Sequence, residues 1–145
     1  MSTLNLDSPS VQSYLAILQG VITRMASNSA SAKSWCVGLV SAIVVIVADK
    51  RNPTYVWISL VPIVLFFFLD AYYLGLERLF REVYNGFIRK LHAGKATLED
   101  VFIIAPGSTG VILRAAAAAT LSLSIWPFYG LLVLMLLLVK YWVLR

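Results

Sequence analysis

This chain of 145 residues has little of the chemistry on which most enzymes depend. It contains one cysteine, Cys36, and one histidine, His92, so it can form no intrachain disulfide and no cluster of cysteine and histidine metal ligands. Charged residues make up only 13% of the chain and hydrophobic residues 60%, a balance outside the range of soluble globular domains. We therefore expect an integral membrane protein that is not an enzyme and that holds no metal and no cofactor.

The most informative hydrophobic run covers residues 55–76 and contains a single charge, Asp70. About 20 apolar residues in a helix cross a hydrocarbon core of roughly 30 Å. This run is long enough, and it predicts a transmembrane helix. Residues 30–48 predict an earlier span, and the charged turn before residue 55 makes the two a hairpin. Pro62 is a candidate bend in the second of these spans.

A third apolar segment predicts a span over residues 117–139, crossed by Pro127. Residues 10–29 place apolar side chains at helical spacing opposite a polar face, which predicts an amphipathic helix at the interface or in the cytosol. The helical start of this segment is expected at Pro9, beside Ser8 or Ser10.

After Leu76 the helical spacing of apolar side chains continues over residues 77–95, now with charged residues between them. This helix is expected to leave the membrane without stopping and to end near Gly94, before a linker over residues 96–110. The predicted fold is an all-α membrane protein, a single domain of residues 1–145. It has three transmembrane helices, an N-terminal amphipathic helix and a cytoplasmic helical extension of the second span.

Basic residues are divided unequally between the two sides of the predicted spans, and Lys and Arg resist translocation. The larger group comprises Arg24, Lys33, Arg78, Arg81, Arg89, Lys90, Lys95 and Arg114, and the smaller group Lys50, Arg51, Lys140 and Arg145. This distribution predicts a cytoplasmic amino terminus and a carboxyl terminus on the outer side.

Asp70 is a candidate pore or gating residue, because an ionisable group inside a span is costly and usually faces a helix-bundle interior or water. Its candidate partners are Lys33 and Arg114, which would enter the bilayer from the cytoplasmic side at comparable depth. Two interpretations stay open. The carboxylate either forms a salt bridge that fixes the helices, or attracts cations and takes part in gating.

The helix over residues 77–95 carries more basic than acidic residues. Its candidate ligand-binding residues are Arg78, Arg81, Arg89, Lys90 and Lys95. Such a surface can hold phosphates and stack on bases, but basic residues beside a membrane also arise from topology and from contact with anionic lipids. Glu77 with Arg81, and Arg78 with Glu82, are four residues apart and are predicted to pair along the helix.

The stretch from Phe68 to Tyr84 combines an acidic residue, paired aromatics and a Glu-Arg dipeptide at the expected membrane exit. These residues are Asp70, Tyr72, Tyr73, Glu77 and Arg78. The pattern resembles small bacterial membrane effectors of nucleotide-signalling antiphage systems, including SLATT-type effectors and the channel effector of the Hailong system. The likeness in organisation extends from about Ser10 to Leu91.

The resemblance implies a homo-oligomeric pore, for instance a tetramer, in the bacterial inner membrane. It also implies gating by an oligonucleotide or cyclic nucleotide from a partner nucleotidyltransferase, and action by membrane depolarisation. The predicted third span and periplasmic carboxyl terminus depart from the two-span pattern of these effectors. Two alternatives stay open: a holin-like lysis protein, which needs no ligand, and a structural subunit of a larger membrane complex. For that subunit the docking face would comprise Ser29, Ala30, Ser34, Gly38, Ser41 and Ala42.

Overall fold

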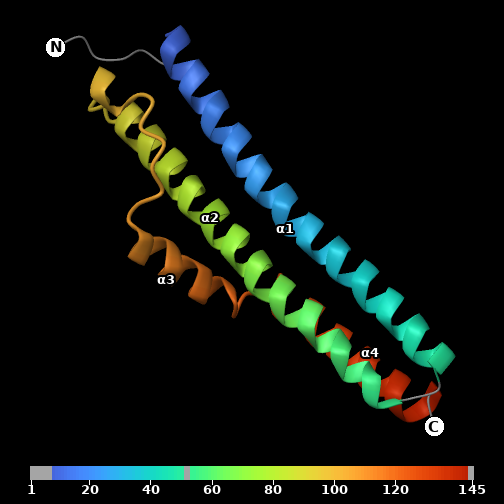
Figure 1. Cartoon of the computed structure of the whole chain (residues 1–145). Coiled ribbons are helices and arrows are strands. Elements are labelled where there is room, and N and C mark those ends of the chain that lie inside the picture. Colours follow the sequence, from blue (N-terminus) through green and yellow to red (C-terminus); the bar gives the residue numbers. More distant parts are fainter. Residues whose placement is uncertain (1–7, 51–52, 144–145) are drawn as a thin grey trace.

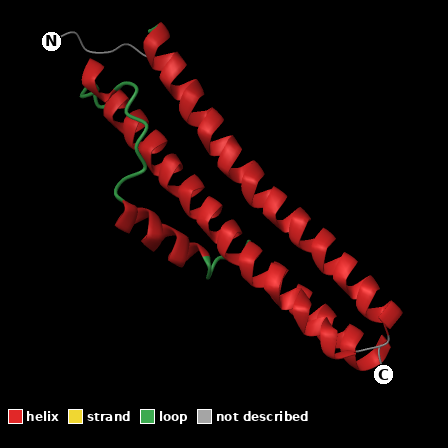
Figure 2. Ribbon diagram, viewed as in Figure 1, coloured by secondary structure: helices red, strands yellow, loops and turns green. Residues whose placement is uncertain are grey.

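The computed structural model describes residues 8–50 and 53–143, and these residues form helices, turns and loops without a strand (Figure 1, Figure 2). The four α-helices are α1 (Pro9–Lys50), α2 (Leu60–His92), α3 (Thr109–Ala119) and α4 (Trp126–Leu138). Shorter helical turns are the 3₁₀ turns Pro53–Ser59 and Leu98–Asp100 and the π-helical turn Val139–Val143. The all-helical fold class is therefore as the sequence predicts.

Helices α1 and α2 lie side by side as a long antiparallel hairpin (Figure 1). Helix α1 is one continuous helix of 42 residues, which joins the segments predicted separately as residues 10–29 and 30–48. The reason is that no proline and no glycine stop lies between these segments. Helix α2 continues through Leu76 without a break, as predicted, and has 33 residues.

Local signals set the ends of the hairpin helices. Ser8 precedes α1, and its hydroxyl accepts a hydrogen bond from the Val11 amide at 3.3 Å, while the missing N–H of Pro9 costs nothing in the first turn. Helix α2 ends where Gly94 adopts a φ of 65°. The Lys95 amide then donates to the carbonyl of Lys90 at 2.9 Å, which completes a Schellman cap.

The third apolar segment differs from its prediction. Instead of one helix over residues 117–139, α3 ends at Ala119, and α4 begins at Trp126. Pro127 lies in the first turn of α4. Its ring has no N–H and clashes with the carbonyl four residues earlier, so a helix cannot pass through it without distortion. Pro62 likewise lies in the first turn of α2, where it needs no bend.

Helices α3 and α4 both pack along α2, α3 near its middle and α4 near the hairpin turn (Figure 1). The contact between α2 and α3 depends on Gly75. A Cβ atom at this position would lie 2.7 Å from the amide nitrogen of Ala116 and 2.8 Å from the carbonyl carbon of Ala115. Only a glycine therefore allows this close backbone approach.

The hairpin has two buried clusters and two halves of different character. We call residues 9–24 of α1 with 77–92 of α2 the stalk, and residues 25–50, 53–76 and 126–141 the apolar half. The stalk cluster includes Val11, Tyr14, Leu18, Ile22, Phe80, Phe87 and Leu91. The cluster of the apolar half comprises Cys36, Val40, Ile63, Ala71, Ala119, Ile125, Tyr129 and Leu136. The charged residues of α2 other than Asp70 thus lie in the stalk, whereas α1 carries Arg24 in the stalk and Lys33, Asp49 and Lys50 in the apolar half.

Candidate functional site: a buried ion pair and a basic stalk

Asp70 is fully buried, with 0% of its surface exposed, and its carboxylate has two partners from α1. Lys33 Nζ lies 2.6 Å from Asp70 Oδ2. The Ser29 hydroxyl donates a short hydrogen bond to Asp70 Oδ1, and Lys33 Nζ also lies 3.3 Å from Ser29 Oγ. Serine and lysine are four residues apart, so both reach the carboxylate from one face of α1.

These two charges are isolated within their helices. Lys33 is the one charged residue of α1 between Arg24 and Asp49. Asp70 is the one charged residue between position 53 and Glu77. The fold places them directly opposite each other, so the apolar parts of α1 and α2 carry no net charge between these limits. A carboxylate out of water needs such a partner, because an unpaired buried charge is strongly destabilising.

The two predicted partners of Asp70 have different outcomes. The pairing with Lys33 is confirmed at 2.6 Å. Arg114 of α3 is exposed, and in the part of the chain that the structure describes it forms no ion pair. Arg114 therefore contributes nothing to the neutralisation of Asp70 in this conformation. Its side chain lies on the outer surface of the short helix.

Helix α4 covers this site from a third direction. The Tyr129 hydroxyl donates to the Phe66 carbonyl at 3.0 Å, four residues before Asp70 on α2. Ala119 and Ile125, on either side of the break between α3 and α4, are buried with Ala71 in one cluster. The break between α3 and α4 thus packs against the cluster that contains Ala71, the neighbour of Asp70 in the chain.

The ion pair can join α1 to α2, and it cannot contact a passing cation in this conformation because no surface of Asp70 is exposed. The geometry therefore favours the interpretation of a salt bridge that fixes the helices. A role in gating requires that α1 and α2 separate at this level.

The stalk does not bring all five predicted basic residues together. Arg78 and Arg89 are about three turns apart and share one face of α2, with Arg81 one turn from Arg78. All three side chains are exposed. Lys90 lies about 100° further round the helix, and Lys95 follows the helix end. The candidate surface is thus a face of three arginines.

One of the two predicted intrahelical ion pairs forms. Arg81 Nη2 lies 2.8 Å from Glu77 Oε1, and Arg81 Nε donates to the same oxygen at 2.9 Å. Arg78 and Glu82 form no ion pair among the residues that the structure describes.

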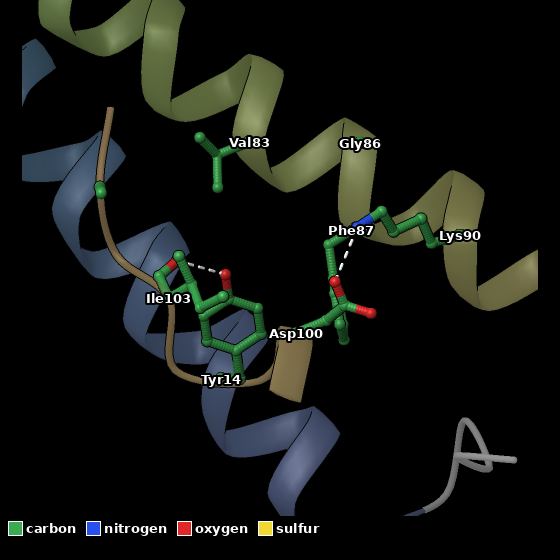
Figure 3. Close-up of a pocket in the computed structure, with 8 residues that line it drawn as sticks. Tyr14, Val83, Gly86, Phe87, Lys90, Asp100 and Ile103 are labelled. Carbon is green, nitrogen blue, oxygen red and sulfur yellow. Dashed lines mark hydrogen bonds and ion pairs between the residues drawn. The ribbon is translucent and has the colours of Figure 1, made fainter. Parts of the chain in front are cut away.

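Lys90 instead ties the end of α2 to the loop that follows it (Figure 3). Lys90 Nζ lies 2.6 Å from Asp100 Oδ1, while Asp100 Oδ2 accepts hydrogen bonds from the backbone N–H and the hydroxyl of Thr97 at 3.0 and 3.2 Å. The hydrogen bond from Lys90, followed by that from the Thr97 amide, lowers the pKa of Asp100 below its usual range. Thr97 and Asp100 form the capping box that their spacing suggests.

Tyr14 of α1 also contacts the loop that follows α2. Its hydroxyl donates to the Ile103 carbonyl at 2.6 Å, and burial, followed by the nearby Asp100 charge, raises its pKa. A cavity of about 250 Å³ lies here, lined by Tyr14, Val83, Gly86, Phe87, Lys90, Asp100, Ile103 and Ala105 (Figure 3). The role of Tyr14 had no sequence signal, because it depends on a loop carbonyl that follows the positive φ of 68° at Phe102.

A second hollow of the stalk lies between α1 and α2, with a volume of about 300 Å³. Its lining residues are Gln19, Ile22, Thr23, Ala26, Arg81, Tyr84 and Asn85. The sequence assigns Gln19 and Thr23 only to the polar face of an amphipathic helix. It gives no sign that this face forms a groove with α2. Comparison with known proteins adds no assignment, since no family model, curated protein or solved structure matches this chain.

Proposed function

We propose that this chain is an integral membrane protein whose apolar half crosses the bilayer, and that several copies form an ion-conducting pore regulated from the cytoplasmic stalk. The observation that carries the proposal is the combination of an exposed apolar surface with a fully neutralised charge pair inside it. The resemblance to antiphage channel effectors supplies the class of pore and of signal.

The membrane location rests on where the hydrophobic side chains lie. Both long helices contain an 18-residue window of mean hydropathy 1.9, yet only 22% and 33% of the residues in these windows are buried. The core helix of a soluble protein is mostly buried instead. Large exposed side chains of this half include Trp35, Val45, Ile46, Tyr55, Val61, Leu65, Phe68 and Met135. Lipid tails are the solvent that such a surface suits.

The lengths of the helices agree with this location. The stretch from residue 25 to 48 in α1 corresponds to about 35 Å of helix, and so does the stretch from residue 54 to 76, which joins the 3₁₀ turn Pro53–Ser59 to the first half of α2. Each therefore crosses a hydrocarbon core of about 30 Å with room for tilt. Lys140 Nζ lies 4.4 Å from the centre of the Trp57 ring near the hairpin turn, an arrangement typical of the membrane interface.

A pore requires more than one copy, because two long helices and one shorter apolar helix of a single chain enclose no sizeable water path. Helix α1 offers a surface for a second copy, because it exposes small residues at helical spacing. They are Ala30, Ser34, Gly38, Ser41 and Ala42. A Cβ at Gly38 would meet nothing within 4 Å, and small residues allow close helix packing in membranes. Ser29, the sixth residue of the predicted docking face, is instead buried against Asp70.

In this proposal the Lys33–Asp70 pair holds α1 and α2 together in the non-conducting state. A nucleotide or oligonucleotide signal at the stalk arginines biases the packing of the two helices, and the pore depolarises the membrane when they shift. The chain resides in the bacterial inner membrane with its stalk in the cytoplasm.

Reconstitution into planar lipid bilayers tests this proposal. Single-channel recording is expected to show discrete conductance steps, and addition of oligonucleotides to the stalk side changes the open probability. Gly38→Leu, which blocks close packing on the outer face of α1, should abolish the steps, and Gly20→Leu in the stalk is the matched control. A stable monomer in nanodiscs that passes no current under any of these conditions contradicts the proposal.

Growth and crosslinking experiments in cells, beside the recordings, separate the two alternatives. A holin-like protein would kill cells on reaching a threshold amount and would ignore oligonucleotides. A structural subunit would crosslink through α1 to a different protein and pass no current alone.

A further inference from the structure

The groove between α1 and α2 in the stalk is polar on both walls. Its lining includes Gln19 and Thr23 from α1 and Arg81, Tyr84 and Asn85 from α2. These side chains supply two carboxamides, two hydroxyls and a guanidinium, all able to donate hydrogen bonds. At about 300 Å³ the groove is at the small end of the range of ligand sites.

Arg81 is positioned but not saturated. It directs Nε and Nη2 to a single oxygen of Glu77, whereas a guanidinium has five N–H donors. The Glu77 side chain is only 12% exposed and the Arg81 side chain 60%, so the carboxylate anchors the guanidinium from the protein side. The remaining N–H groups are available to an anion, and the planar fork of arginine matches phosphate oxygens.

We infer that this groove binds a phosphate group, with Arg81 as the charged donor and with Gln19, Thr23 and Asn85 completing the hydrogen bonds from both helices. Tyr84 lines the same groove and supplies an aromatic ring beside which a planar group attached to the phosphate can lie. The site deepens the proposed function, since it reduces the predicted basic surface to Arg81 and adds three polar residues. The regulatory consequence rests on the proposed function, whereas the binding itself does not.

The groove lies on the same seam of the hairpin as the buried ion pair. Arg81 is 11 residues from Asp70 on α2, and Thr23 is 10 residues from Lys33 on α1, about three helical turns in each case. A phosphate bound by residues of both helices therefore constrains the seam about three turns from the Lys33–Asp70 pair. It also competes with Glu77 for Arg81.

Two sources of the phosphate fit this position. Arg81 follows the end of the predicted span by one turn, so it is within reach of a lipid headgroup, and the groove continues away from the membrane toward Gln19 and Asn85, where a soluble nucleotide has access. The chemistry recognised is the same in both cases.

The test is calorimetric titration of the full chain in a zwitterionic detergent with adenosine 5′-monophosphate, with adenosine as the uncharged comparison. A parallel titration uses nanodiscs of phosphatidylcholine with and without phosphatidic acid, in which lipid that occupies the groove competes with the nucleotide. We expect saturable binding of the phosphate-bearing probe in detergent, in competition with phosphatidic acid, and none of adenosine.

Variants distinguish specific binding in the groove from nonspecific attraction of the phosphate to the basic surface. Arg81→Gln should weaken binding by about tenfold or more, since a charge-assisted hydrogen bond is lost, while Arg114→Gln, at an exposed arginine of α3 that does not line the groove, leaves binding unchanged. Glu77→Gln should strengthen binding, because the competing carboxylate is gone, a result that a purely structural role of the pair does not give. Arg81→Lys, which keeps the charge, restores part of the affinity.

Each outcome bears on the inference. If the nucleotide binds in detergent and phosphatidic acid displaces it in nanodiscs, the groove also accepts the phosphate of a lipid; if phosphatidic acid leaves the nucleotide bound, the phosphate comes from a soluble nucleotide. Equal losses in Arg81→Gln and Arg114→Gln, or no saturable binding of the nucleotide, overturn the inference. Phosphate binding to a chain that conducts no current under any condition would keep the groove and refute the pore.

Discussion

Removal of Lys33 is the sharpest perturbation of this fold, because it leaves a carboxylate without its counter-charge. In Lys33→Met the stem of the side chain is kept, but Asp70, which is 0% exposed, loses the ammonium at 2.6 Å. Breaking a buried ion pair from one side costs about 3–5 kcal/mol. We expect a loss of this size in the free energy of unfolding.

Removal of Asp70 should lower the free energy of unfolding less than removal of Lys33 does. The Lys33 side chain is 19% exposed, so in Asp70→Leu its flexible stem can carry the ammonium toward water. The double variant Lys33→Met/Asp70→Leu removes both charges, and replacing a buried pair by apolar residues is often neutral or stabilising. We therefore expect a large loss in the free energy of unfolding for Lys33→Met and a smaller loss for Asp70→Leu. The double variant should recover nearly all of the stability.

The assay is reversible denaturation of the purified chain in detergent micelles, followed by the helical signal in circular dichroism. Arg81→Gln is the matched control, because the Glu77–Arg81 pair is also formed but its arginine is 60% exposed, and such a pair is worth about 0–1 kcal/mol. If Lys33→Met lowers the free energy of unfolding no more than this control, Asp70 is not a buried anion. The Lys33–Asp70 pair then does not hold α1 and α2 together.

Three further predictions concern the packing, the pH response and the assembly. Gly75→Ala places a Cβ 2.7 Å from the α3 backbone and should destabilise the chain by about 1–3 kcal/mol, whereas Gly20→Ala meets nothing within 4 Å and should gain about 0.5–1 kcal/mol of helix stability in the same denaturation assay. Because the pKa of Asp100 is lowered, its stabilisation of the loop is present above the ordinary Asp pKa of about 3.9 and is lost as the pH falls through the lower folded value. NMR titration of the Thr97 amide should show a midpoint below 3.9 that Lys90→Met moves upward, and an unshifted midpoint would contradict the role of that ion pair. Gly38→Leu should reduce the oligomer mass in native mass spectrometry without lowering the helical content, and an unchanged mass would exclude this face of α1 from the interface.

Much of the hairpin was predictable because its signals are local. Ser8 and Pro9 mark the start of α1, and Gly94 marks the end of α2, where the structure has the cap that these residue types favour. The Lys33–Asp70 pair was predictable because these are isolated charges on adjacent apolar segments, and such charges need each other.

The break between α3 and α4 was not predictable from periodicity. Nearly every residue of that segment is apolar, so no polar face fixes a helical phase, and Pro127 alone does not show on which side the helix will end. The stalk groove was missed for a different reason. Gln19 and Asn85 are 66 residues apart in the sequence, and only the register of the two helices brings them together.

The central claim is that the apolar half crosses the bilayer, with the hairpin turn and the stalk on opposite sides. The direct measurement is labelling of single cysteines, placed at Lys50 or at Arg89 in a Cys36→Ala background, by a membrane-impermeant maleimide on bacterial spheroplasts. We expect the cysteine at position 50 to be labelled in intact spheroplasts and the cysteine at position 89 to be labelled only after lysis. Equal labelling of both positions before lysis would contradict this claim.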